Sequence, residues 1–316
     1  METTGAAAND PNPEFTKKFQ ETIQAYADST EAGKDDEAQM AALSALLMAA
    51  EEGIKNPTPE LILKQKADDL ENQCEWVEAE KVRREILSME ENMEEKTGKC
   101  ALIAKAQMDL SRLLRTCGRI DESLVVAREA IASARRADFS SLIATTLQSA
   151  AFCALEAGDP KGALALACEA VDIIEPGKIR ETTKTRALAT RARFRLANGD
   201  IAGAAQDLEQ GRDRKWEKWA GCGLPGPAFA LANWWETKSE LERQQGNFDA
   251  AREALKQAID GRRHFDSPHA KLSLAKNLEN LAELCHRAGE FENAKSALEE
   301  ADTIRRNLKL PSGPIK

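Results

Sequence analysis

The segment Leu281-Ala-Glu-Leu-Cys-His-Arg-Ala-Gly-Glu-Phe-Glu-Asn-Ala294 joins an apolar helical stretch to a turn and a second stretch. Its turn residue, Gly289, precedes the small residue Ala294 by five positions. The same arrangement recurs at Gly33–Ala38, Cys74–Ala79, Gly118–Ser123, Gly158–Ala163, Gly199–Ala204 and Gly246–Ala251. A period of about 20–50 residues is the sequence signature of a repeat architecture, so this recurrence decides the fold.

Each turn is expected to separate two helices of one pair. Glycine permits the positive φ that ends the first helix, and an acidic residue just after it suits the amino terminus of the second. The apolar residues Leu110, Leu113 and Leu114 share one face of the predicted helix before Gly118, as helical periodicity requires. The sequence therefore predicts an all-α protein, a right-handed α-solenoid of about seven helix pairs without a β-sheet.

The repeated pattern resembles the tetratricopeptide repeat, and residues Ser267–Ala294 are similar to the longer repeats of kinesin light chains. Successive turns are 41, 44, 40, 41, 47 and 43 residues apart, against about 34 in the shortest tetratricopeptide unit. The resemblance implies a tetratricopeptide-like (TPR-like) solenoid that binds other proteins. It is specific for fold and nearly silent on activity.

The predicted solenoid covers residues 12–308, between disordered tails at residues 1–11 and 309–316. A Trp-rich insert at residues 214–228 interrupts it between the turns near 199 and 246. Four tryptophans lie in or beside this insert: Trp216, Trp219, Trp234 and Trp235. They either fill the gap of the longest unit or form an aromatic contact surface.

Composition excludes several classes of function. The formal net charge of -9 at pH 7 disfavours binding to nucleic acid or to acidic membrane surfaces. No apolar stretch approaches the about 20 residues that a membrane span requires, and the first residues do not resemble a signal peptide. We expect a cytoplasmic protein whose seven cysteines are small buried hydrophobes, neither disulfide-bonded nor zinc-binding.

No arrangement of residues predicts catalysis, a cofactor or a metal. The segment Gly221–Gly226 matches GxGxxG formally, but no strand precedes it, and Pro225 and Pro227 are expected to break the next turn. The three histidines, His264, His269 and His286, lack metal-ligand spacing and are expected to be solvated or capping. We therefore predict a protein that is not an enzyme.

The resemblance implies that the first helices of the pairs line a concave, peptide-binding surface. The arginines at positions 112, 115, 186 and 193 predict a basic central groove for another protein or an acidic peptide segment, because arginine binds carboxylates through two hydrogen bonds. Toward the carboxyl end the charge reverses at Glu236, Glu240 and Glu283. The predicted contact residues are Lys105, Arg112, Arg115, Gln148, Phe152, Arg186, Thr190, Arg193 and Asn280.

The sequence is compatible with three functions. For the arginine-rich surface there is also the alternative that it is a solvated charged face that binds no ligand. The first function is a non-catalytic scaffold for protein–protein interaction. The second is a regulatory sensor whose superhelix responds to a small peptide or metabolite and which would carry a deep pocket near the tryptophans. The third is single-stranded RNA binding by arginine and tryptophan, which the negative net charge disfavours most.

Overall fold

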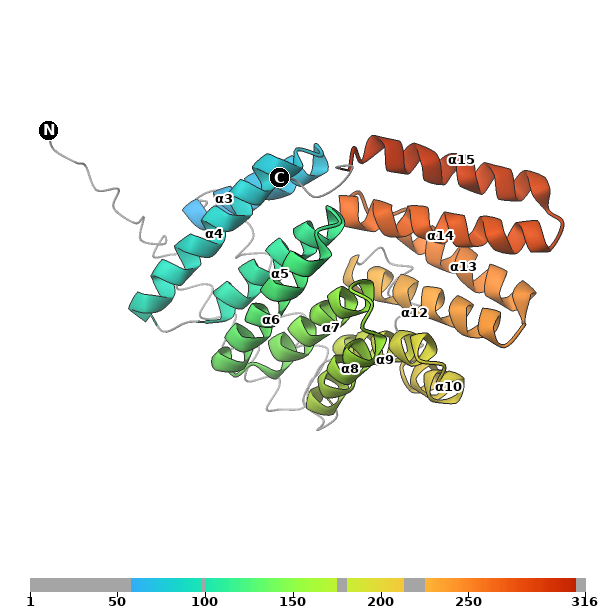
Figure 1. Ribbon diagram of the computed structural model, residues 1–316, viewed down its shortest axis with the longest axis horizontal. Helices are drawn as coiled ribbons and strands as arrows, with labels where there is room; N and C mark the ends of the chain where they lie inside the picture. The colour runs from blue at the N-terminus through green and yellow to red at the C-terminus, as the bar shows by residue number, and fades with distance from the viewer. Residues whose placement is uncertain (1–57, 98–99, 175–180, 213–224, 311–316) are drawn as a thin grey trace, which may run out of the picture. The chain divides into compact units, whose positions relative to one another are not determined.

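The computed structural model describes residues 58–97, 100–174, 181–212 and 225–310, and these residues form twelve α-helices and no β-strand (Figure 1). The predicted all-α class is confirmed. The predicted tail at residues 1–11, the turn at Gly33 and the segment 311–316 lie outside the described residues. The chain divides into two compact units, Met1–Lys66 and Ala67–Lys316, and the cavities and the contacts between helix pairs belong to the second unit.

The helices follow one another as antiparallel pairs (Figure 1). Their bounds are α3 Pro59–Asn72, α4 Trp76–Thr97, α5 Ala101–Thr116, α6 Ile120–Ala137, α7 Ser140–Glu156, α8 Pro160–Ile174, α9 Glu181–Ala197, α10 Ile201–Gln210, α12 Pro225–Gln244, α13 Phe248–Arg262, α14 Pro268–Arg287 and α15 Phe291–Asn307. Among the described helices, none is long and apolar enough to cross a membrane.

The first helix of each described pair ends at a residue with positive φ. Gly118 has a φ of 76°, and the N–H of the next residue, Arg119, donates to the carbonyl oxygen of Leu114 at 2.9 Å. This is the hydrogen bond of a Schellman motif, which satisfies a carbonyl left over at the helix end. The turn between α3 and α4 uses Cys74 instead of glycine, at a φ of 62°.

Small residues allow the two helices of a pair to approach closely. The residue five positions after each of the turns from Cys74 to Gly289 is buried, and so is the first-helix residue that precedes it by twelve positions. Between α5 and α6 these are Ser123 and Ser111, whose hydroxyls donate to each other's carbonyl oxygens at 2.8 and 2.9 Å. Equivalent pairs are Ala67/Ala79, Ala151/Ala163, Ala192/Ala204, Ser239/Ala251 and Ala282/Ala294.

A bulky residue at one of these positions should disturb the pair. We expect Ala163→Leu to lower the free energy of unfolding by about 1–3 kcal/mol, because Ala163 is fully buried in the cluster that contains Ala151 and Phe194. Ala165→Leu on the same helix is the matched control, since Ala165 is exposed. Urea denaturation measures both, and equal stability of the two variants would show that the inferred register is wrong.

The tryptophans beside the insert belong to the core between neighbouring pairs. Trp234 is 5 % exposed, and its Nε1 donates to the carbonyl oxygen of Leu208 on α10 at 3.0 Å. Its ring meets Trp235 edge to face at 4.9 Å, and Trp235 is partly buried against the same cluster. The prediction of a contact surface is therefore wrong for Trp234, because both its ring and its N–H are used inside the fold. Trp216 and Trp219 lie outside the described residues.

The start of α12 corrects a second prediction. Pro225 and Pro227 do not break the turn after the insert, because α12 begins at Pro225. Proline is compatible with the first turn of a helix, where its missing N–H would have no partner within the helix. The two prolines therefore mark a helix start.

The first and last described pairs are in direct contact. The indole N–H of Trp76, at the start of α4, lies 3.2 Å from the carbonyl oxygens of both Leu308 and Lys309. Leu310 packs against the cluster formed by Trp76, Leu113 and others. The predicted disordered tail at 309–316 therefore begins too early, because Lys309 and Leu310 are held by Trp76.

Most of the described cysteines are small buried residues. Cys100, Cys117, Cys153 and Cys285 are buried, and the six described cysteines are free thiols. Burial raises the pKa of the Cys117 thiol to about 11, so this group stays neutral at physiological pH. Such thiols are poor nucleophiles and poor metal ligands.

Candidate peptide-binding site

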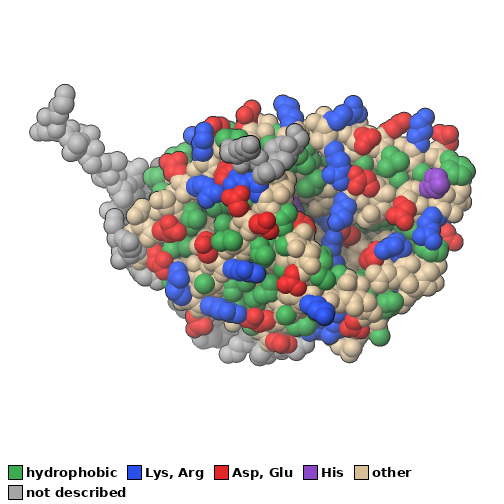
Figure 2. All heavy atoms as spheres, viewed as in Figure 1, with side chains coloured by type: hydrophobic (Ala, Val, Ile, Leu, Met, Phe, Trp, Pro, Cys, Tyr) green, Lys and Arg blue, Asp and Glu red, His purple; other side chains and the backbone are tan. Residues whose placement is uncertain are grey.

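Three cavities lie along the first helices of the pairs. The central cavity has a volume of about 310 Å³ and is lined by residues of α5, α7, α9, α12 and α14, together with the last residue of α13 and Arg305 of α15. The adjoining cavity, of about 340 Å³, shares Arg193, Glu236 and Lys276 with it. The third cavity, of about 440 Å³, includes Arg112 and His269. Figure 2 shows a hollow on one face of the molecule with Lys and Arg side chains along its edge.

Two of the predicted arginines meet over one aromatic ring in the central cavity. The guanidinium carbons of Arg115 and Arg193 lie 5.9 and 5.4 Å from the ring centroid of Phe152. Arg115 pairs with Glu156 at 2.9 Å, and Arg193 pairs with Glu236 at 2.9 Å. At these distances the ring attracts both cations, which also form their ion pairs.

Glu236 is the shared anion of this cavity. It pairs with Arg193 from α9 and also with Arg262 from α13, whose Nη2 donates to Asn233 Oδ1 at 2.7 Å as well. Burial alone would raise the pKa of Glu236, but the charges of Arg193 and Arg262 lower it to about 2. Glu236 is therefore ionised at every physiological pH, and it joins three helices.

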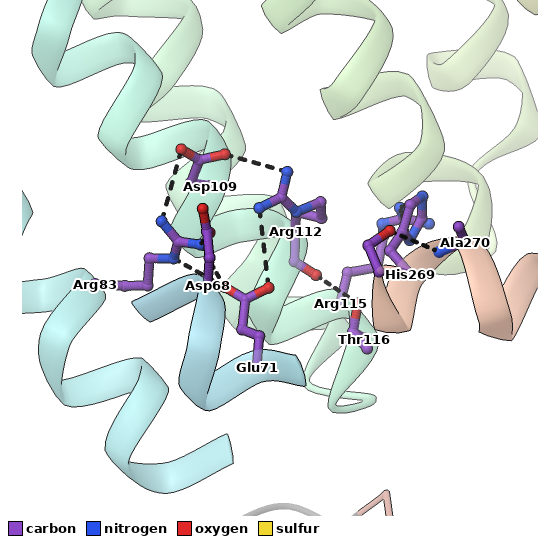
Figure 3. A network of polar contacts seen from close by, with 10 residues as sticks. Asp68, Glu71, Arg83, Asp109, Arg112, Arg115, Thr116, His269 and Ala270 are labelled. Atoms are coloured by element: carbon purple, nitrogen blue, oxygen red, sulfur yellow. Dashed lines mark hydrogen bonds and ion pairs between the residues drawn. The ribbon is translucent and has the colours of Figure 1, made fainter. Parts of the chain in front are cut away.

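His269 lies in the wall between the central and third cavities. Arg115 Nη2 is 3.5 Å from both of its ring nitrogens (Figure 3). Burial lowers the pKa of His269, and the nearby charges of Arg115, Arg112 and Arg262 lower it further, to about 3. His269 is therefore neutral at pH 7 and forms part of the cavity, contrary to the expectation of a solvated or capping residue.

This histidine should make stability depend on pH. Its pKa is about 6.5 when unfolded and about 3 when folded, so only the unfolded chain gains a proton between these values. Lowering the pH from 7 to 5 should then cost up to about 2 kcal/mol of the free energy of unfolding through His269.

Urea denaturation at the two pH values measures this loss. His269→Gln should remove most of it, whereas His264→Gln should leave it unchanged, because His264 is exposed. An identical pH dependence in wild type and His269→Gln would contradict the assignment.

The predicted reversal of charge has a counterpart in the adjoining cavity. Glu236, Glu240, Glu283 and Asn280 all line it, opposite Arg193, Arg243 and Lys276. Burial opposes ionisation of Glu240, but hydrogen bonds from Arg243 and Gln244 lower its pKa. The adjoining cavity is lined by three cationic side chains and three carboxylates, whereas the central cavity is lined by five cationic side chains and two carboxylates.

Arg112 faces a separate set of acidic residues. It pairs with Asp109 at 3.2 Å and lies 3.9 Å from Glu71, which also binds Arg83 (Figure 3). Asp68 and Asp266 contribute further carboxylates to the third cavity. The four predicted arginines therefore do not share one cavity, because carboxylates from α3 and α5 hold Arg112 apart from Arg193.

The remaining predicted positions line none of these three cavities. Gln148 and Thr190 are buried, and the Thr190 hydroxyl donates to the carbonyl oxygen of Arg186 one turn earlier. Arg186 is half-buried and donates to Thr145 at 2.8 Å. Lys105 is exposed near the start of α5. Gln148 and Thr190 are therefore corrected to packing positions, because both side chains are buried.

Two important residues of the central cavity are not among the predicted contacts. Arg262 is the last residue of α13, a second helix, and the repeat pattern assigns the groove to first helices. Lys276 lies four residues before Asn280 on α14, so it shares the face of a predicted contact residue. Helical periodicity could have found Lys276, but no local pattern marks Arg262.

Metal binding has no support in the described part of the chain. No group of three or more His, Cys, Asp or Glu side chains there could hold a metal ion. The segment that matches GxGxxG lies mostly outside the described residues. The arrangement of the cavities is suited to binding a ligand by charge and aromatic contact.

Comparison with known proteins identifies one repeat of the chain. Residues 275–308 match the family model of the tetratricopeptide repeat. No sequence among the curated proteins is similar enough to count as a relative. A solved structure of a putative kinesin light chain with nearly identical TPR-like repeats, from Podosopora anserina, aligns at 18% identity and a TM-score of 0.40, covering 66% of this chain and 97% of that one.

Two structures of Rap proteins are more similar in fold. A Rap protein complexed with Competence and Sporulation Factor has 12% identity and a TM-score of 0.56, covering 95% of this chain and 77% of that one. The Rap conjugation gene regulator of the plasmid pLS20, in complex with the Phr* peptide, has 11% identity and a TM-score of 0.55, covering 98% and 80%. Residues 275–308 are thus a tetratricopeptide repeat, and the described helix pairs have the fold of TPR-like α-solenoids.

Proposed function

We propose that this chain is a non-catalytic, cytoplasmic scaffold that binds an extended segment of another protein, or an acidic peptide, along the central and adjoining cavities. One observation carries the proposal. The two cavities share Arg193, Glu236 and Lys276, so they adjoin along α7, α9, α12 and α14, and we infer that they act together as one recess. Their combined volume suits several side chains of an extended segment and is too small for a folded domain.

The chemistry of the recess supports a peptide ligand. Phe152 offers an aromatic surface with Arg115 and Arg193 over it, which suits apolar and acidic side chains together. Asn280, which is exposed on α14, can donate to and accept from a peptide backbone. One of the two Rap proteins is complexed with a sporulation factor and the other with a peptide, and the likeness in fold makes peptide binding by this chain a reasonable hypothesis.

A regulatory sensor is the second candidate, and the contact between the first and last pairs favours it. Helix pairs in such arrays contact mainly their neighbours, so a change in the angle between two pairs propagates along the array. In this chain it would also act on the contact between the first and last described pairs. A ligand in the central cavity would touch α5, which follows α4 with its Trp76, and α14, which precedes α15 and Leu308. It could therefore act on the hydrogen bond between Trp76 and Leu308. Faster hydrogen exchange at residues 307–310 on ligand binding would favour the sensor, and unchanged exchange would favour the scaffold.

Selection from a random peptide display library tests the proposed function. Peptides recovered with the full chain should bind at least about tenfold more weakly to Arg115→Ala, since a charged hydrogen bond contributes about 1.5–3 kcal/mol when sheltered. Binding to Asn280→Ala should weaken by about two- to tenfold, because the hydrogen bonds of this amide are uncharged. Arg128→Ala is the matched control, because Arg128 is exposed on the second helix α6. The proposal fails if no peptide is enriched, or if all three variants bind equally well.

A further inference from the structure

We propose that the central cavity holds a carboxylate-binding subsite formed by Arg193, Arg262 and Lys276. The inference rests on the proposed function, because it assigns the acidic group of the bound segment to this place. The three cations come from α9, α13 and α14, and all of them line the cavity. They are therefore brought together only by the fold.

The first ground is an imbalance of charge. Arg193 and Arg262 both pair with one carboxylate, that of Glu236, and the charge of Lys276 also acts on it. Lys276 itself makes no ion pair within 4 Å to any residue that the structure describes, and Arg115 already pairs with Glu156. Three cations around one anion leave positive charge in the cavity, and Lys276, which is exposed, is accessible to an anion from solvent.

The second ground is a set of buried donors without acceptors. Arg262 is 2 % exposed, and its Nη2 binds Glu236 and Asn233. Its Nε and Nη1 are buried and meet no acceptor among the described residues. Buried donors in folded proteins are nearly always satisfied, so an oxyanion that reaches Arg262 through a small shift of its neighbours gains hydrogen bonds that the protein alone does not make.

The third ground is the neutral histidine in the wall of the cavity. His269 faces Arg115, Arg112 and Arg262, with Glu236 as the acidic group that acts on it. In its neutral form it adds no charge to the cavity and offers a nitrogen as a hydrogen-bond acceptor or an N–H as a donor. The site therefore keeps the same positive charge between about pH 5 and 8.

Carboxylate fits this subsite better than phosphate does. The cavity is walled by Phe152, Phe229 and Leu272, so the group that carries the charge should also carry apolar carbon. A guanidinium and a carboxylate are both planar and match each other in shape.

Glutarate is a suitable probe, with glutaramide as its uncharged isostere. At matched ionic strength we expect glutarate, but not glutaramide, to raise the melting temperature of the full chain and to give a saturable binding isotherm. Lys276→Met should weaken glutarate binding about tenfold, and Lys276→Arg should restore it. Lys256→Met is the matched control, since Lys256 on α13 is exposed as Lys276 is but lines none of the three cavities.

Three results would contradict the proposed carboxylate-binding subsite. They are the absence of a glutarate effect in the wild type, equal binding by Lys276→Met and wild type, and tighter binding of inorganic phosphate than of glutarate. Unfolding of Lys276→Met is excluded as a cause by its melting temperature without ligand, and Lys276→Arg serves as the second variant.

The subsite and the proposed function fail in different ways. If display selects no peptide but glutarate binds with the expected dependence on Lys276, the subsite stands and the peptide scaffold falls. If peptides bind with equal affinity after every Glu or Asp is changed to its amide and the carboxyl terminus is amidated, the scaffold stands and the subsite falls. Loss of binding on amidation alone identifies a terminal carboxylate, and loss on Glu→Gln alone identifies a side chain.

Discussion

Replacing Asp207 with alanine is expected to lower the free energy of unfolding by about 3–5 kcal/mol, the usual cost of removing one partner from a buried ion pair. Asp207 is 1 % exposed on α10 and binds two arginines of α9. Arg191 donates to it through Nε and Nη2 at 3.0 and 2.7 Å, and Arg195 Nη1 lies at 3.0 Å. Without Asp207 both guanidinium groups lose their buried counter-charge, and α10 loses its main polar link to α9.

Urea denaturation followed by circular dichroism measures this loss. Asp172→Ala on α8 is the matched control, because Asp172 is exposed, and it should change stability by no more than about 0.5 kcal/mol. Asp207→Asn keeps the shape but removes the charge, and it should fall between the wild type and Asp207→Ala. A loss of less than about 1 kcal/mol in Asp207→Ala would contradict the buried pair.

Replacing Trp76 with alanine is expected to cost about 3–5 kcal/mol as well, for a different reason. The side chain is 5 % exposed and fills a cluster with Ala79, Leu113 and Leu310. Its removal leaves a cavity and also deprives the carbonyl oxygens at the end of α15 of their donor. The contact between the first and last described pairs should therefore loosen first.

Two measurements separate these effects. Trp76→Phe keeps an aromatic ring without the N–H, so it should retain most of the packing and lose about 1 kcal/mol for the hydrogen bond. In Trp76→Ala, hydrogen exchange should accelerate at residues 307–310 more than within α9. Full stability in Trp76→Ala, or exchange that rises uniformly along the chain, would contradict a local contact of this kind.

The candidate site is only partly predictable from the sequence. Helical periodicity and the repeat register together assign Arg115, Phe152 and Arg193 to first helices, and the structure brings these three together. The same register fails for Gln148 and Thr190, which are buried. A register error of one residue turns a helical side chain by about 100°, which is enough to move it from the groove into the contact between helices.

Arg262 shows why the rest of the site required the structure. It is distant in sequence from Arg193 and lies on a second helix, which by the repeat pattern faces away from the groove. Its position at the last residue of α13 nevertheless lets the side chain reach Glu236. Side-chain length and the angle between neighbouring pairs decide such a contact, and neither is encoded in a local pattern.

The helical class and the small residues that close each pair can be recognised in the sequence, because they depend on interactions within about forty neighbouring residues. Glycine at a turn and Ala163 against Ala151 are local requirements that any unit must meet. The contact of Trp76 with Leu308, and the grouping of Arg193, Arg262 and Lys276 around one carboxylate, emerge only when the pairs are stacked. Small rotations between successive pairs add up along the array, so contacts between distant units follow from the sum of all packing angles and not from any single repeat.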